Sequence, residues 1–196
     1  MKLDKLRHFS FPRDEIAFED KKSAAVWRGG AHNPVRKELV LRYRGHPLFD
    51  VGFSDVQPTQ ADYGPFLHPK EQMAYRYIIS LEGVDVASNL KWIMASNSLC
   101  LMPPPNYETW FMEGRLQPGI HYVQVAPDMH DLEDKLLFYE RHPDDARAII
   151  RNANDYVSQF LNAGMERVVS ILVMYKYFVA TGQVEPDKTV ESLISL

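Results

Sequence analysis

Several features that mark common protein classes are absent from this sequence. It has one cysteine, Cys100, among 196 residues, which excludes an internal disulfide and argues against a zinc site built from thiolates. Its seven histidines are scattered, and no two have the spacing of metal ligands on one helix. Its 22 lysines and arginines are outnumbered by 26 acidic residues, so no overall positive field attracts nucleic acid. We therefore expect neither a metal site nor a nucleic-acid partner.

A long apolar run is also lacking. The longest such stretch, residues 168–180, is interrupted by Ser170 and Lys176 and is shorter than the roughly 20 residues that span a bilayer. Residues 1–15 alternate charged and apolar side chains, without the continuous apolar core of a signal peptide. These observations predict a soluble, cytoplasmic protein.

What is present is the composition of an ordinary globular domain, with 45% apolar and 24% charged residues. Short apolar runs predict strands at 23–27, 48–53, 75–81, 98–102 and 120–125. Periodicity and capping residues predict helices at 35–45, 69–74, 86–95, 107–112, 132–142, 143–160 and 163–180. The predicted N-caps include Asn33, Asp85 and Asp128.

The order of these elements indicates the fold class. Strands alternate with helices and no hairpin signal joins them, so we predict an α/β fold with a Rossmann-like, mostly parallel sheet flanked by helices. We place an irregular segment at 1–22, the Rossmann-like domain at 23–162 and a C-terminal helical extension at 163–196. In such sheets, ligands bind where the carboxyl ends of strands meet helix N-termini.

The stretch WRGGAHNPVR, residues 27–36, has this arrangement. Gly29 and Gly30 follow a strand and allow close approach of the backbone to a ligand, and Asn33 precedes a helix whose N-terminus favours anions. Arg28 and Arg36 could bind a phosphate from either side. A tight turn with two surface arginines explains the same pattern equally well. The stretch contains neither GxGxxG nor GK[ST], so it is not a dinucleotide fingerprint or a P-loop.

The stretch YIISLEGVDVASNLKW, residues 77–92, repeats the design. A buried strand ends at Glu82-Gly83, and a carboxylate in that position commonly binds ribose or sugar hydroxyls. The next predicted helix presents Ser88 and Asn89 in its first turn. The alternative is that Glu82 caps the helix or pairs with Lys91. Further on, three prolines at 103–105 end the next strand at the same rim, where they would shape a wall without spare N–H donors.

Taken together, these motifs resemble glycosyltransferase family 90. The succession is WRGG with NPxR, YIISLEG with ASNLKW, NSLCL, YETWF, and LQPGIHYVQV with DMHDLEDKLLFY, across about residues 20–160. The residues of these motifs are most similar to those of the bacterial lipopolysaccharide core type. The resemblance implies an enzyme with two Rossmann-like halves of the GT-B kind, of which this chain is similar to the C-terminal, donor-binding one.

The resemblance also implies a reaction and a set of site residues. The reaction is transfer of a sugar from a UDP-linked donor to a glycan such as lipopolysaccharide core, with inversion, without a cofactor or an obligatory metal. The enzyme would be cytoplasmic, or peripheral at the inner face of a bacterial membrane. The loop that holds the donor diphosphate corresponds to Trp27, Arg28, Gly29, Gly30, Asn33, Pro34 and Arg36. The Asp-Gly pair corresponds to Glu82-Gly83, and an aromatic region corresponds loosely to Tyr107, Glu108 and Trp110.

The sequence departs from the family pattern in two ways. Asn89 stands where eukaryotic-type members carry a phosphate-binding arginine, and Lys91 is the candidate replacement. The catalytic aspartate of the family belongs to an N-terminal half without a counterpart in this chain, so no catalytic base is assigned. The sequence leaves open which protein partner would be needed. It could be a separate N-terminal acceptor half or a second copy of the chain. The alternatives are a non-catalytic, nucleotide-sugar-binding or dimerising fragment and a nucleotide-binding regulator of another α/β type.

Overall fold

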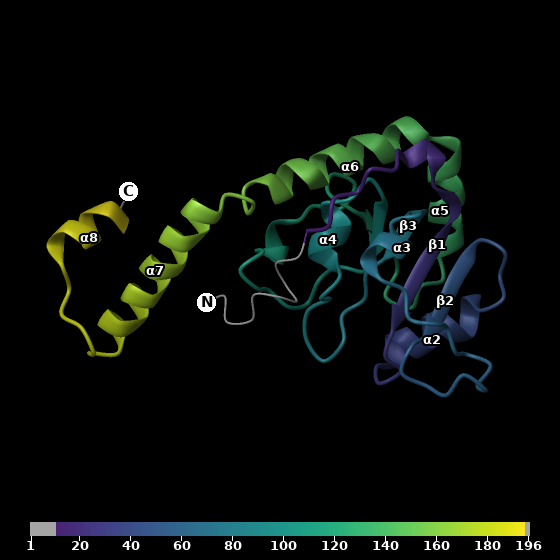
Figure 1. Cartoon of the computed structure of the whole chain (residues 1–196), viewed down its shortest axis with the longest axis horizontal. Coiled ribbons are helices and arrows are strands. Elements are labelled where there is room, and N and C mark those ends of the chain that lie inside the picture. Colours follow the sequence, from purple (N-terminus) through teal and green to yellow (C-terminus); the bar gives the residue numbers. More distant parts are fainter. Residues whose placement is uncertain (1–10, 195–196) are drawn as a thin grey trace.

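The computed structural model describes residues 11–194 and contains a five-stranded sheet between layers of helices (Figure 1). The strands are β1 (Lys22–Gly29), β2 (Phe49–Phe53), β3 (Tyr75–Ile79), β4 (Leu99–Met102) and β5 (Val123–Gln124). Their order is β2-β1-β3-β4-β5, and every neighbouring pair is parallel. The predicted α/β fold with a parallel sheet is confirmed.

The direction of winding reverses beside β1. The chain leaves β1 towards β2 on one side and then returns to place β3 on the other side. The connections that follow β1 and β3 therefore diverge at the carboxyl edge of the sheet. A crevice at this topological switch point is where ligands bind in doubly wound folds.

Within residues 11–194, seven α-helices connect or follow the strands. They are α2 (Pro34–Tyr43), α3 (Pro69–Gln72), α4 (Leu90–Met94), α5 (Leu132–Arg141), α6 (Pro143–Ser158), α7 (Ala163–Ala180) and α8 (Lys188–Ile194). Two short 3-10 helices, η1 (Phe18–Asp20) and η2 (Glu113–Arg115), lie in loops. The start of α2 follows from its sequence, because the Asn33 side chain accepts a hydrogen bond from Val35 N and Pro34 occupies the first helical position.

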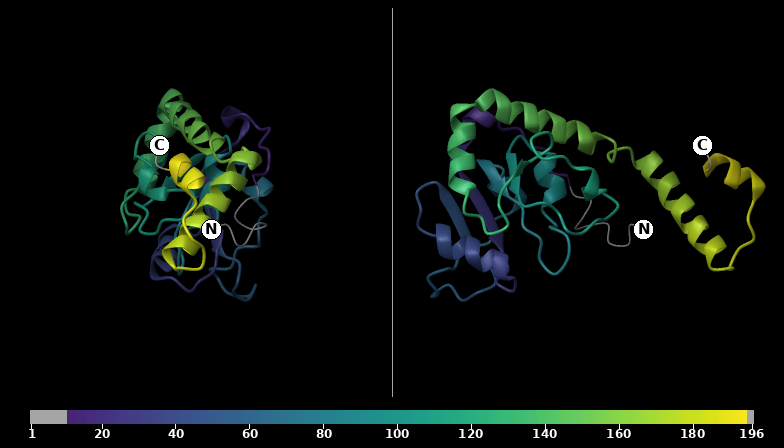
Figure 2. Two further views of the ribbon diagram at one scale, coloured as in Figure 1. Left: turned by 90° about the vertical axis from the view of Figure 1, so that its left-hand side faces the viewer. Right: turned by 180° about the vertical axis from the view of Figure 1, so that it is seen from behind.

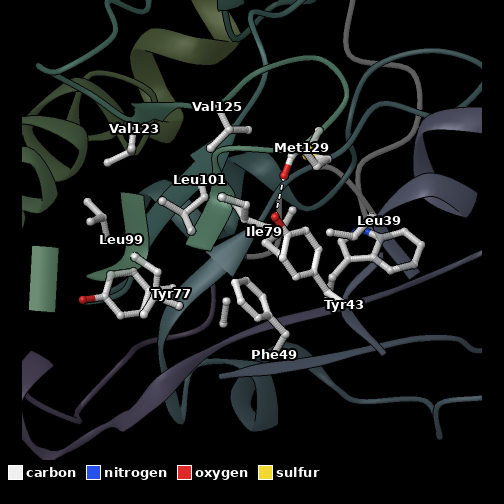
Figure 3. Close-up of a cluster of buried hydrophobic side chains, with 14 of the residues drawn as sticks. Leu39, Tyr43, Phe49, Tyr77, Ile79, Leu99, Leu101, Val123, Val125 and Met129 are labelled. Carbon is white, nitrogen blue, oxygen red and sulfur yellow. Dashed lines mark hydrogen bonds between the residues drawn. The ribbon is translucent and has the colours of Figure 1, made fainter. Parts of the chain in front are cut away.

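Each face of the sheet has its own apolar core, since side chains of a strand alternate between the faces. In β4, Leu99 and Leu101 pack into one cluster and Cys100 and Met102 into the other. Figure 3 shows the first cluster, where α2 and α5 cover the sheet. Within it the Tyr43 hydroxyl donates to the Met129 carbonyl at 2.6 Å.

The second cluster contains α4 and the irregular segment 110–116. The helix α6 contributes to both clusters, with Ile149 in the first and Val157 in the second. It crosses the edge at which the strands begin, because Asn154 Nδ2 donates to the carbonyls of Met94 and Ser96 just before β4. At the opposite edge, where the strands end, the chain forms loops.

The helix α7 has no buried residue, and with α8 it projects away from the rest of the molecule (Figures 1 and 2). Its bounds agree with the predicted helix at 163–180. No helix in the described part of the chain is long and apolar enough to cross a membrane.

Four local predictions were wrong. The strand predicted at 120–125 is limited to Val123–Gln124. The helix predicted at 86–95 is limited to Leu90–Met94, because the residues around Asp85 form a turn in which Gly83 N donates to Asp85 O at 3.0 Å. Residues 107–112 are irregular, with a turn at 110–111, rather than helical. The N-cap of α5 is Asp131, whereas Asp128 forms an ion pair with His130 at 2.6 Å.

The ends of the chain are described in part. Residues 11–21 are irregular apart from η1, and β1 begins at Lys22, one residue before the predicted strand. Residues 1–10 of the predicted N-terminal segment, and residues 195–196 of the predicted extension, lie outside the described residues. The division at 22 and 162 stays a prediction. The short helix α8 was not predicted.

Candidate functional site

A cavity of about 250 Å³ opens at the carboxyl edge of the sheet, beyond the ends of β3 and β4. Its walls come from the start of α2, from the residues between β3 and α4, and from the residues that follow β4. The apolar lining consists of Val35, Leu81, Val86, Ala87, Leu90, Met102, Pro103, Pro104, Pro105 and Pro127. The polar or backbone lining consists of Asn33, Ser80, Glu82, Gly83, Asn106, Tyr107 and Glu113. The prediction that the three prolines form a wall at this rim is confirmed.

The start of α2 holds the Glu82-Gly83 turn in place. Arg36 Nε donates to the Glu82 carbonyl and Nη2 to the Leu81 carbonyl, each at 3.1 Å. Asn33 Nδ2 donates to the Gly83 carbonyl at 3.0 Å. A Cβ at position 83 would lie 2.9 Å from Arg36 Nη2, so a larger residue there would displace the guanidinium from its present position. The two sequence motifs that were predicted to bind the same ligand therefore contact each other directly.

The Glu82 carboxylate closes one side of the cavity. Its Oε1 accepts from the backbone nitrogens of Asn106 at 2.9 Å and Tyr107 at 3.1 Å, and its Oε2 accepts from Asn106 Nδ2 at 2.9 Å. The carboxylate thus joins the end of β3 to the segment behind the prolines. Each carboxylate oxygen can accept two hydrogen bonds, so Oε2 keeps one acceptor position for a ligand. The alternative that Glu82 pairs with Lys91 is wrong, because Lys91 bonds to a different carboxylate.

Arg28 does not line the cavity. Its guanidinium forms an ion pair with Asp50 at 2.5 Å and donates to three carbonyls, those of Trp27, Asp50 and Pro65. Its side chain is only 6% exposed. The second Asp50 oxygen accepts from the Tyr75 hydroxyl. The structure therefore connects Arg28 to the loop after β2, and it does not bring the two arginines to opposite sides of one ligand.

The glycine pair after β1 lies beside a carboxylate. Ala31 N donates to Asp55 Oδ1 at 3.0 Å and to Oδ2 at 3.2 Å. A Cβ at Gly30 would lie 2.7 Å from Asp55 Oδ2, so the carboxylate contacts bare backbone. The loop thus has the geometry to donate hydrogen bonds to an anion, although neither Gly29 nor Gly30 lines the cavity. Asp55 was not identified from the sequence, since nothing in its local pattern points to residue 31.

Ser88, Asn89 and Lys91 do not line the cavity either. Ser88 is half-buried in the turn before α4. Asn89 Nδ2 donates to the Ile79 carbonyl and its Oδ1 accepts from the Ser80 hydroxyl, each at 3.1 Å. These bonds fix the start of α4 against the end of β3. Asn89 thus supports the segment that lines the cavity.

Lys91 forms a buried ion pair with Glu113 at 2.8 Å, and both side chains are 2% exposed. Glu113 also accepts from Thr109 N at 2.6 Å and from the Thr109 hydroxyl at 2.8 Å. Burial acts to raise the pKa of Glu113, but the Lys91 ammonium and the Thr109 donors hold that pKa below its ordinary value of 4.5. The Lys91 ammonium is thereby held away from any ligand phosphate. The role of Glu113 was missed, although an acid within the apolar run WFMEGRL is a signal that could have drawn attention to it.

The site holds no assembled metal-ligand set. No group of three or more histidine, cysteine, aspartate or glutamate side chains that could bind a metal ion occurs among the described residues. Within the cavity the two carboxylates, Glu82 and Glu113, both accept hydrogen bonds from protein groups. The arrangement is therefore suited to binding through hydrogen bonds and apolar contact.

Comparisons with known proteins point to one family. The family profile described as Glycosyl transferase family 90 matches residues 5–184. O-glucosyltransferase LpsA of Dichelobacter nodosus is 53% identical over 179 residues, which cover 91% of this chain and 56% of LpsA. Protein O-glucosyltransferase 1 of Homo sapiens is 24% identical over 156 residues, 74% of this chain and 38% of the relative. Protein O-glucosyltransferase 2 of Danio rerio is 27% identical over 139 residues, which cover 67% of this chain and 28% of the relative. The chain spans about half, or less, of the length of these relatives.

Proposed function

Because the chain belongs to glycosyltransferase family 90, we propose that it is the donor-binding portion of a glycosyltransferase. The donor would be a nucleotide-sugar, UDP-linked, and the acceptor a glycan such as lipopolysaccharide core, with inversion at the transferred sugar. The observation that carries the proposal is the cavity at the carboxyl edge of a doubly wound parallel sheet. An acceptor of this type would place the reaction at the cytoplasmic face of a bacterial inner membrane.

The two kinds of wall suit the two ends of a nucleoside. Val35, Val86 and Leu90 offer apolar contact for a base, and the free acceptor position on Glu82 Oε2 suits a ribose or sugar hydroxyl. The volume of about 250 Å³ is at the small end for a ligand site, so the cavity would hold part of the donor and leave the rest outside.

Arg36 does not line the cavity, but it donates to the carbonyls of Leu81 and Glu82, which do, and it is the cation that we assign to the diphosphate. Two of its nitrogens are bonded to carbonyls, and the third, Nη1, lies 3.5 Å from His32 Nε2. Burial lowers the pKa of Arg36, while the nearby Asp55 carboxylate acts in the opposite direction. Because the ordinary pKa of an arginine is as high as 12.5, Arg36 remains charged at neutral pH. Together with the N-terminus of α2, it would stabilise negative charge on the leaving diphosphate.

The second candidate function is binding without turnover. It is favoured by the two cavity carboxylates, Glu82 and Glu113, which both accept hydrogen bonds from protein groups and leave no assigned general base. Such a fragment would bind the donor but would need a separate acceptor half for transfer.

The test is a calorimetric titration of the chain with UDP, GDP and CMP. We expect binding that is selective for UDP and that weakens about tenfold or more in Arg36→Ala, the range expected when a hydrogen bond to a charged group is lost. The matched control is Arg42→Ala, since Arg42 lies on the same helix in a surface ion pair with Glu38. Equal affinity for all three nucleotides, or equal loss in both variants, would contradict the proposal. Transfer of glucose from UDP-glucose to an added glycan would then decide between the enzyme and the binding fragment.

A further inference from the structure

The loop after β1 carries a carboxylate from another part of the chain. Ala31 N donates to Asp55 Oδ1 at 3.0 Å and to Oδ2 at 3.2 Å. A Cβ at Gly30 would lie 2.7 Å from Oδ2, so the carboxylate lies directly against the backbone of the loop. Loops between a strand and a helix N-terminus bind phosphates through their backbone N–H groups. In this structure, the anion at such a position is a side chain of the protein itself.

Asp55 also acts on the cation that we assign to the diphosphate. Its carboxylate tends to raise the pKa of Arg36, against the effect of burial. The Arg36 Nη1 atom lies 3.5 Å from His32 Nε2, and a Cβ at Gly30 would lie 2.7 Å from His32 Nδ1. A carboxylate, an imidazole and a guanidinium therefore surround the same short loop. A diphosphate on this loop would use the same N–H group and the same guanidinium as Asp55, and the two anions would repel each other.

The attachment of Asp55 to the loop is weak. The two oxygens share one N–H donor, and the residue is exposed. Exposed charged contacts of this kind contribute little energy, so the side chain can leave at small cost. Other contacts hold the loop, because Ser54 N donates to the Gly29 carbonyl at 3.0 Å and the Asn33 side chain caps α2. Release of the carboxylate therefore leaves the loop in place.

We propose that Asp55 occupies the position of a donor phosphate and competes with the diphosphate for the loop after β1. This inference rests on the proposed function, since it takes that loop as the place of the diphosphate. Binding breaks the bonds from Ala31 N to Asp55, and the side chain turns into solvent. Asp55 thus lowers the affinity for ligands that carry a phosphate and leaves the affinity for an unphosphorylated nucleoside unchanged. Its return to the loop favours release of the nucleotide product.

The competition is tested by calorimetric titration with UDP and with uridine at low ionic strength. We expect Asp55→Asn to bind UDP about threefold to fivefold more tightly than the wild type, and to bind uridine equally well. Asp62→Asn is the matched control, because Asp62 lies in the same loop and contacts β2 through its carbonyl, which accepts from Phe53 N at 2.9 Å. Unchanged or weaker UDP binding in Asp55→Asn, an equal gain in Asp62→Asn, or an equal gain for uridine would overturn this inference and leave the proposed function standing.

Inorganic pyrophosphate is the probe that separates this inference from the choice of nucleotide. Asp55→Asn should bind pyrophosphate more tightly than the wild type by a similar factor, and the amide signal of Ala31 should shift during the titration in nitrogen-15 NMR spectra. This gain together with equal affinity for UDP, GDP and CMP would support the role of Asp55 and contradict the proposed function. Failure of all three proteins to bind either UDP or pyrophosphate would overturn both.

Discussion

Arg28 and Arg36 lie on either side of the glycine pair, yet their surroundings differ. Arg28 is bonded to Asp50 and to three carbonyls, whereas Arg36 supports the turn that borders the cavity. We therefore expect Arg28→Ala to lower the free energy of unfolding by about 2–3 kcal/mol, a value that allows for the partial exposure of Asp50. Urea denaturation measures it. Arg42→Ala is the control, expected to change stability by less than about 0.5 kcal/mol. A loss for Arg28→Ala no larger than that would show that its bonds are not structural.

Lys91 gives a second prediction at this scale. Lys91→Met leaves the Glu113 carboxylate buried without its cation, which should cost about 3–5 kcal/mol of unfolding free energy. Adding Glu113→Gln removes the uncompensated charge, so the double variant should recover part of the loss. Both are measured by urea denaturation at neutral pH. A double variant less stable than Lys91→Met would indicate that Glu113 stabilises the fold through Thr109 rather than through the lysine.

The two arginines show what local sequence can and cannot predict. Their position beside a glycine turn at the carboxyl edge follows from the motif, and the structure agrees with that placement. Their different roles depend on the pairing of β1 with β2, which sets Arg28 beside Gly52 and close to Asp50. That pairing joins residues more than twenty positions apart. No local pattern contains it.

At the scale of elements, the helix predicted at 107–112 does not form, and the contacts of residues 103–116 show why. The nitrogens of Asn106 and Tyr107 donate to Glu82, and Thr109 N donates to Glu113. Met112 has a left-handed backbone conformation, φ 55°, which a residue inside a right-handed helix cannot adopt, so the segment continues into the short 3-10 helix η2 instead. By contrast, helices α2, α6 and α7 were predicted well, because their caps, prolines and periodicity are local.

The helix α6 holds this segment through one side chain. The Tyr156 hydroxyl donates to the carbonyls of Phe111 at 2.7 Å and Met112 at 2.9 Å, and burial raises the Tyr156 pKa to about 12 from 10.0. A raised folded-state pKa contributes stability that is complete below pH 10 and is lost as the pH rises through 12. We expect the free energy of unfolding to fall above pH 10, and to fall less steeply in Tyr156→Phe.

Urea denaturation between pH 8 and about pH 12 measures this slope. At pH 8, Tyr156→Phe should be less stable than the wild type by about 1 kcal/mol, since two carbonyls lose their donor. Tyr175→Phe on α7 is the control, because the Tyr175 hydroxyl lies on the surface. Parallel pH profiles for Tyr156→Phe and wild type would show that Tyr156 does not carry the alkaline effect. The fall would then belong to other buried tyrosines, among them Tyr75, whose pKa is raised by burial and by Asp50 to about 12, and Tyr77, whose pKa is raised by burial and by Glu140.

At the scale of the whole molecule, the sheet with its two cores and the α7–α8 extension should be energetically separate. Phe160 is the last residue in the second core, and none of α7 is buried. Deletion of residues 163–196 should therefore leave the urea midpoint and the UDP affinity unchanged. Deletion from residue 157 onward is the matched control, because it also removes Val157 and Phe160 and should cost about 3 kcal/mol or more. A lower midpoint after the first deletion would mean that α7 contributes to the stability of the sheet, and the extension would then be part of one cooperative unit.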